Sequence, residues 1–340
     1  MKIIPSALVL AAYLWIAAPD TPHGTIVASN MRDNTATIID AASGKVLATL
    51  PTGEAPHEVA TTHDGRWAVV SNYGTRERPG NSITVIDLDR LAVARTIDLG
   101  EYRRPHGMAF FPGDTLLAVT SEVSRAVLLV AFRDGRVGAT VPTGQRASHM
   151  LAMSLDGGEL FTANIADHSI SRLDVARRGT RSVIPVVKNP EGIAISPDGK
   201  YVWVGSDADS VVVVLDTDAG HAIDTLRGFG LPYRLAVTRD GRTAIATDPM
   251  HGNVRIFDAA TRHQRLLIAI PREGILATAE ITGSPSPEGI TTSPDSRWAF
   301  VTLQGRNQVA TIDLQHGTIA SYAPTGNWSD GIAFSTLEHR

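Results

Sequence analysis

The chain has 340 residues, 43% of them hydrophobic and 19% charged, so it is long enough to bury a sizeable core. Its formal charge of −4 disfavours broad nucleic-acid binding, which is typical of strongly basic proteins. Cysteine is absent, which excludes disulfides, thiolate metal ligands and a cysteine nucleophile.

The N-terminal segment has the composition of an export signal. Lys2 precedes an apolar run from Ile3 to Ala18, and small residues precede Pro19. This pattern predicts a signal peptide over residues 1–18 and a periplasmic or secreted protein, with an uncleaved N-terminal anchor as the alternative. No later segment is apolar and long enough to cross a bilayer, so no transmembrane domain is expected after cleavage.

The rest of the chain repeats one short motif. It reads "APHEVATTHDG", "RPHGMAFFPGD", "ASHMLAMSLDG", "NPEGIAISPDG", "LPYRLAVTRDG", "SPEGITTSPDS" and "WSDGIAFS". One position of the motif, called the ring position below, is followed in each case by a run of mainly apolar residues. Its occupants are His57, His106, His149, Glu191, Tyr233, Glu288 and Asp330. A return close to every 42 residues, with two longer intervals, indicates units the size of one propeller blade.

Each unit reads as four short strands. In "EGIAISPDGKYVWVGSDADSVVVVLDTDAGHAIDTLRG" four β-branched runs alternate with turn residues, and no helical period appears. Asp-Gly pairs such as Asp198-Gly199 separate the first two strands, and we assign these aspartates to hairpin turns rather than to catalysis. We therefore predict an all-β, seven-bladed β-propeller of four-stranded blades, forming a single domain over residues 24–335.

The two ends of the domain are expected to share a blade. The chain enters at a second strand, "GTIVASN", and ends on a first strand, "DGIAFS". Three N-terminal strands and one C-terminal strand would then close the ring and leave no open edge.

The repeats resemble a known family. "SITVIDLDRLAVARTIDLGEYRRPHGMAFFPGDTLLAVTS" and "PEGIAISPDGKYVWVGSDADSVVVVLDTDAG" are similar to the units of YVTN (YncE-type) seven-bladed propellers, over residues 24 to 335. The resemblance implies the fold. It does not imply one activity, because such propellers include ligand-binding, cell-surface, nucleic-acid-binding and enzymatic proteins.

The ring positions are the first candidate site, because the first strand of each blade lines the propeller axis. His57, His106 and His149 would ligate a divalent transition metal such as Zn, Mn, Cu or Fe. Glu191 or Glu288 would then act as general base and Tyr233 as proton donor. The alternative is a polar, water-filled channel mouth in which these side chains bond to one another.

Other polar residues near this face are candidate ligand contacts. Asn72 and Asn164 end the second strands of their blades, where asparagine either bonds its own loop or orients a ligand or imidazole. Arginines gather near the histidines, which indicates an anionic ligand unless they are simply solvated. The predicted ligand-binding residues are Asn72, Asn164, Arg103, Arg104, Arg146, Arg234 and Asp330.

Three functions remain open from the sequence. The first is an exported propeller that binds a small molecule, a metal or a protein partner at the channel mouth. The second is a metal-dependent hydrolase, lactonase or lyase, so enzymatic activity is undecided. The third is a scaffold in cell-surface adhesion or redox assembly. We expect a monomer and no nucleic-acid partner.

Overall fold

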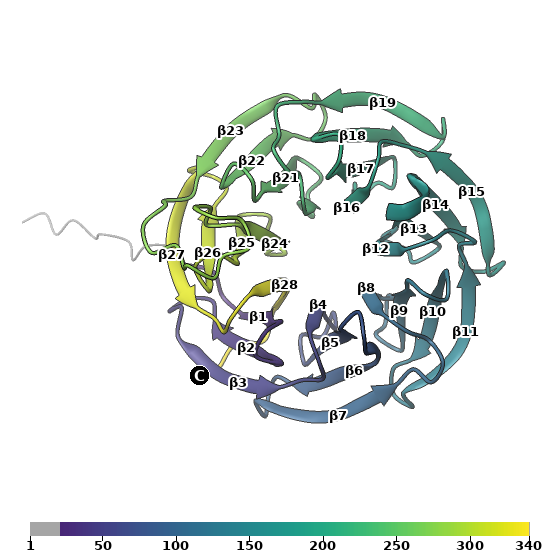
Figure 1. The fold of residues 1–340 in the computed structure, drawn as a ribbon, viewed down its shortest axis with the longest axis horizontal. Helices are drawn as coiled ribbons and strands as arrows, with labels where there is room; N and C mark the ends of the chain where they lie inside the picture. Colours follow the sequence, from purple (N-terminus) through teal and green to yellow (C-terminus); the bar gives the residue numbers. More distant parts are fainter. Residues whose placement is uncertain (1–20, 340) are drawn as a thin grey trace, which may run out of the picture.

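The computed structural model describes residues 21–339, and these form a closed ring of seven four-stranded antiparallel sheets (Figure 1). The predicted seven-bladed β-propeller is confirmed. The predicted signal peptide, residues 1–18, lies outside the described residues. Within 21–339, no helix is long and apolar enough to pass through a lipid bilayer.

Blades 1 to 3 are the first three along the chain from the N-terminal end of the described residues. Blade 1 consists of β28 (Ser329–Ser335), β1 (Thr25–Asn30), β2 (Thr35–Asp40) and β3 (Val46–Pro51). Blade 2 consists of β4 (Pro56–Thr61), β5 (Trp67–Gly74), β6 (Pro79–Asp87) and β7 (Ala92–Asp98). Blade 3 consists of β8 (Pro105–Phe110), β9 (Leu116–Ser121), β10 (Ala126–Ala131) and β11 (Arg136–Pro142).

The remaining four blades continue around the ring. Blade 4 consists of β12 (Ser148–Met153), β13 (Glu159–Asn164), the 3₁₀ turn η1 (Ile165–Asp167), β14 (Ser169–Asp174) and β15 (Gly179–Pro185). Blade 5 consists of β16 (Pro190–Ile195), β17 (Tyr201–Ser206), β18 (Val211–Asp216) and β19 (His221–Leu226). Blade 6 consists of β20 (Leu235–Val237), β21 (Thr243–Asp248), β22 (Asn253–Asp258) and β23 (Gln264–Ala269). Blade 7 consists of β24 (Pro287–Thr292), β25 (Trp298–Leu303), β26 (Gln308–Asp313) and β27 (Thr318–Pro324).

The ring closes through blade 1 as predicted. β28 pairs antiparallel with β1, so Thr25 lies opposite Ser335 and Asn30 opposite Ser329. The two ends of the described chain therefore lie in one sheet, and the innermost strand of that sheet comes from the C-terminal end.

The hydrophobic core lies between blades rather than at the centre. Among the described residues each buried cluster joins two neighbouring sheets; one, for example, contains Val69 and Ile83 of blade 2 with Leu117 and Leu128 of blade 3. The hydrophobic surface of each blade is thus buried against its neighbours, which leaves the inner ends of the first strands for polar residues.

The predicted Asp-Gly turns are also found. In the turn after β16, Asp198 Oδ1 accepts hydrogen bonds from Ser196 Oγ at 2.6 Å and from the Lys200 amide at 3.1 Å. Gly199 has a positive φ of 73° there, which a residue without a side chain adopts readily. These aspartates stabilise hairpins, as the sequence indicated.

Candidate functional site

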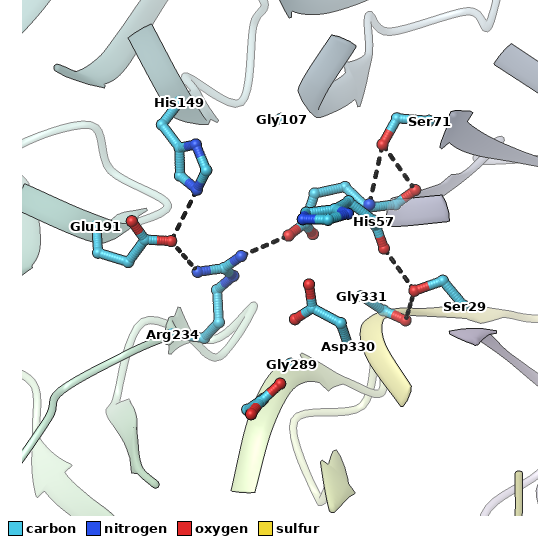
Figure 2. A network of polar contacts seen from close by, with 12 residues as sticks. Ser29, His57, Ser71, Gly107, His149, Glu191, Arg234, Gly289, Asp330 and Gly331 are labelled. Carbon is cyan, nitrogen blue, oxygen red and sulfur yellow. Dashed lines mark hydrogen bonds and ion pairs between the residues drawn. The ribbon is translucent and has the colours of Figure 1, made fainter. Parts of the chain in front are cut away.

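The ring residues stand where the first strands leave the regular ladder. In β4, β8, β12, β16 and β24 the register shifts just after the first residue, so the ring residue and its successor are bulged. A bulge redirects side chains. Figure 2 shows the side chains of His149, Glu191 and Arg234 pointing toward one another, with His57 and Asp330 nearby.

The residue that follows the ring residue differs in type between the blades. In four blades it is glycine, and a Cβ there would crowd the next blade: at Gly331, for example, it would overlap the carbonyl oxygen of His57. Blades 2 and 6 instead carry Glu58 and Arg234, and both side chains are buried. These two charged residues therefore extend into the ring from opposite sides.

Arg234 joins two carboxylates of distant blades. Its Nη2 lies 2.8 Å from Glu58 Oε1 and its Nη1 lies 2.6 Å from Glu191 Oε1. Glu191 Oε1 is in turn 2.8 Å from His149 Nε2, and the other ring nitrogen of His149 bonds Glu122 (Figure 2). Blades 2 to 6 are thus linked by alternating charges around the axis.

Tyr73 and Arg104 extend this network toward the surface. The Tyr73 hydroxyl donates to Glu122 Oε2 at 2.6 Å and accepts from Arg104 Nη1 at 3.0 Å. Arg104 also forms an ion pair with Glu122 at 3.9 Å. The Tyr73 ring stacks on His57 with centroids 4.4 Å apart. Glu122 is therefore shared by a histidine, a tyrosine and an arginine.

The neighbours of His149 hold it in the charged form. Burial alone would lower its pKa, but Glu191 and Glu122 outweigh burial and raise the pKa of His149 to about 10. Burial would likewise raise the pKa of Glu191, yet His149 and Arg234 lower it to about 2. At neutral pH the network contains an imidazolium between two carboxylates.

The charge on His149 gives a pH-dependent prediction. A folded-state pKa raised from 6.5 to about 10 contributes stability that is fully present below 6.5 and lost as pH rises through 10. We expect His149→Gln to reduce the free energy of unfolding by about 3 kcal/mol at mildly acidic pH. Urea denaturation should show that difference shrinking as pH rises toward 10; a difference constant with pH would contradict a charged His149.

His106 differs from its two neighbours. It is completely buried, and neither of its ring nitrogens has a hydrogen-bond partner among the described residues. Its ring centroid lies 3.5 Å from that of His149 and 5.1 Å from that of His57. Burial and the positive charge of His149 hold the pKa of His106 well below its usual value, and burial lowers the pKa of His57 to about 4. Both histidines are neutral bases at physiological pH.

The three histidines are brought together, but they do not form a metal ligand set in this arrangement. Both ring nitrogens of His149 already bond carboxylates. Across residues 21–339 no group of three histidine, aspartate or glutamate side chains is placed to hold a metal ion. Metal binding would require His149 to exchange at least one carboxylate partner.

Three further carboxyl groups, Asp207, Glu288 and Asp330, have raised pKa values, and we call these three the acid sector. Burial, followed by the negative charge of Glu191, raises the pKa of Asp207 to about 7. Burial raises the pKa of Glu288 well above its usual range, with a further contribution from the charge of Asp330, and burial together with the charge of Glu191 raises the pKa of Asp330. Oδ1 of Asp207 and Oδ1 of Asp330 are buried without a hydrogen-bond partner in the described part of the chain. Tyr233 lies beside this sector, with the Arg234 guanidinium 4.2 Å from its ring centroid.

The two predicted asparagines serve their own blades. Asn72 Oδ1 accepts from the Gly53 amide at 2.9 Å, and its Nδ2 donates to Ser82 Oγ at 2.9 Å. Asn164 is fully buried and its Nδ2 donates to Ser171 Oγ at 2.9 Å. Their amides hold strands and loops of their own blades together, and ligand contact by either asparagine stays a prediction.

The predicted arginines divide into three kinds. Arg103 is exposed at the rim. Arg146 bonds Asp167 at 2.6 Å on the exposed surface, and Arg104 faces Tyr73 and Glu122. Arg234 alone reaches the axis, and two carboxylates neutralise it. The positive sector read from the sequence is therefore largely compensated.

The class of protein is thus a seven-bladed β-propeller with a buried ionic ring at its axis. A family profile described as "Choice-of-anchor I domain" matches residues 268–332. The chain is also 26% identical over 275 residues to "Seven-bladed beta-propeller protein Rv1057" of Mycobacterium tuberculosis (strain ATCC 25618 / H37Rv). That match covers 78% of this chain and 61% of the relative, so the chain spans less than two thirds of the relative's length.

Solved structures share the same fold. The chain superposes on a functionally unknown protein from Desulfotomaculum acetoxidans DSM 771 with a TM-score of 0.73 and 14% identity, covering 93% of this chain and 100% of the other. It superposes on Kuenenia stuttgartiensis hydrazine synthase with a TM-score of 0.65 and 18% identity, covering 80% and 87%. At these identities the likeness concerns architecture alone.

Proposed function

We propose that this protein is an exported YVTN/YncE-like β-propeller that binds a small ligand at its inner ring. The observation that carries the proposal is a set of buried polar atoms without partners among residues 21–339: both nitrogens of His106, Oδ1 of Asp330 and Nε of Arg234. Buried polar groups normally find partners, and leaving one unpaired costs about 1–3 kcal/mol. A ligand at the axis would satisfy several of them at once.

Retention of a ligand during gentle purification tests this proposal. We expect native mass spectrometry of protein taken from its own host to show a mass excess that disappears on denaturation. The low-molecular-mass filtrate of a cell extract should raise the melting temperature of wild-type protein and not that of His106→Leu. A bare-chain mass together with no thermal shift would overturn ligand binding.

The second candidate is a metal-dependent hydrolase, lactonase or lyase, favoured only by the closeness of the three histidine rings. Glu191 is a poor general base because it is committed to two cations. Burial and the nearby charge of Asp330 raise the pKa of Glu288, which favours its protonated form and disfavours a role as general base. Elemental analysis of the same preparation decides: no transition metal, and no change in melting on adding Zn, Mn or Cu, would eliminate this candidate.

A further inference from the structure

The charges around the axis do not balance. Three cations reach the inner network, and each is paired: Arg104 with Glu122, His149 with Glu122 and Glu191, and Arg234 with Glu58 and Glu191. These pairs involve three carboxylates, Glu58, Glu122 and Glu191. The acid sector of Asp207, Glu288 and Asp330 is left without an ion pair among residues 21–339.

The geometry of the acid sector points to a missing positive partner. Asp330 is 1% exposed and Glu288 6% exposed, so solvent does not screen them fully. Figure 2 shows the Asp330 carboxyl group turned inward, toward Arg234. Arg234 is not within ion-pair distance of it and is held instead by Glu58 and Glu191. Oδ1 of Asp330 and Oδ1 of Asp207 are each buried and unpartnered in the described chain.

We propose that the acid sector binds a positively charged nitrogen of a small organic ligand, with Asp330 and Glu288 as its principal contacts and Asp207 at its edge. This inference rests on the proposed function and specifies that the ligand is positively charged. It replaces the anionic ligand that the arginine-rich loops suggested, since those arginines are exposed or already paired. An organic cation fits better than a metal ion, because no three acidic or histidine side chains of residues 21–339 are arranged as metal ligands.

Binding of a cation here would be coupled to proton release. The groups that face the sector are Glu191, His149 and Arg234 of the network, Tyr233 of blade 6, and Glu280 of the loop before β24. Burial and the negative charges of Glu191 and Glu280 raise the pKa values of the acid-sector carboxyls, which favours their protonated forms, whereas the positive charges of Arg234 and His149 oppose this. A cation stabilises the ionised forms, so affinity should increase with pH by up to about tenfold per pH unit for each proton displaced.

Titration calorimetry with defined probes tests the inference. The probes are putrescine and choline as organic cations, succinate and inorganic phosphate as anions, and calcium chloride as the metal alone. We expect putrescine or choline to bind more tightly at about pH 8 than at about pH 6, with heats that depend on buffer ionisation because protons are released. Asp330→Asn and Glu288→Gln should each weaken binding at least tenfold.

Two further variants keep the result interpretable. Asp207→Asn alters a half-buried side chain at the edge of the sector and should fold even if Asp330→Asn does not. Asp156→Asn removes the same charge from a turn between β12 and β13 and should bind like wild type. Binding of succinate or phosphate alone, tighter binding of calcium than of the amines, or no binding of either amine would overturn the inference. In each case a retained ligand in native mass spectrometry would leave the proposed function standing.

Discussion

Deletion of residues 329–340 is expected to abolish cooperative folding. The deletion removes β28, which is the innermost strand of blade 1 and pairs with β1. It would expose the edge of β1 and uncover Phe300, which stacks on Phe334 at 5.1 Å between ring centroids. The ring would open between blades 1 and 7, and the hydrophobic cluster that these two blades share would be disrupted. Circular dichroism during heating and size-exclusion chromatography should show an expanded chain without a sharp transition.

The control for this deletion is a shorter one. Removal of residues 338–340 keeps β28 and also Leu337, whose carbonyl accepts from Thr25 Oγ1 at 2.6 Å. We expect that chain to melt cooperatively near the wild-type temperature. If the longer deletion also melted there, closure through blade 1 would not be what holds the ring together.

The fold could be predicted from the sequence because its determinants are local and repeated. Each unit carries its own turn residues, such as Asp198 and Gly199, and its own ring position. Even the shared blade follows from the order of strands at the two ends. A repeated backbone places equivalent residues at equivalent points. The convergence of the ring positions could therefore be predicted without knowing any side-chain contact.

The ionic network could not be predicted in the same way, because it depends on contacts between blades. Glu58 and Arg234 are 176 residues apart and meet at the axis. Glu122 and Asp207 each directly follow a strand that ends on serine, in loops that carry no recognisable motif. Glu58, Glu122 and Asp207 were therefore not among the predicted site residues. One signal was available: Glu58 and Arg234 occupy the position that is glycine in four other blades.

The two carboxylates bonded to His149 explain why the histidine cluster is not a ready metal site. His149 was expected to ligate a metal beside His57 and His106. The sequence could not show that Glu122 and Glu191 lie on opposite sides of its ring and use both nitrogens. A histidine between two carboxylates is more favourable as an imidazolium than as a neutral ligand.

Arg234→Leu is expected to reduce the free energy of unfolding by about 3–5 kcal/mol, because it leaves two buried carboxylates without their shared cation. Glu58 and Glu191 are 8% and 5% exposed and would remain in place. The matched control is Arg242→Leu in the same blade, whose exposed side chain is 4.0 Å from Asp240 and should cost at most about 1 kcal/mol. Urea denaturation at neutral pH measures both.

The pH dependence distinguishes loss of charge pairing from simple loss of packing. In the wild-type protein the lowered pKa of Glu191 contributes stability that is present above its ordinary value of 4.5 and lost as pH falls through about 2. Without Arg234 burial dominates and the pKa of Glu191 should rise, so protonation would relieve the variant in mild acid. The deficit of Arg234→Leu should therefore be largest at neutral pH and shrink toward pH 4.5. A deficit no larger than that of Arg242→Leu, or one independent of pH, would show that Arg234 fills space rather than balancing charge.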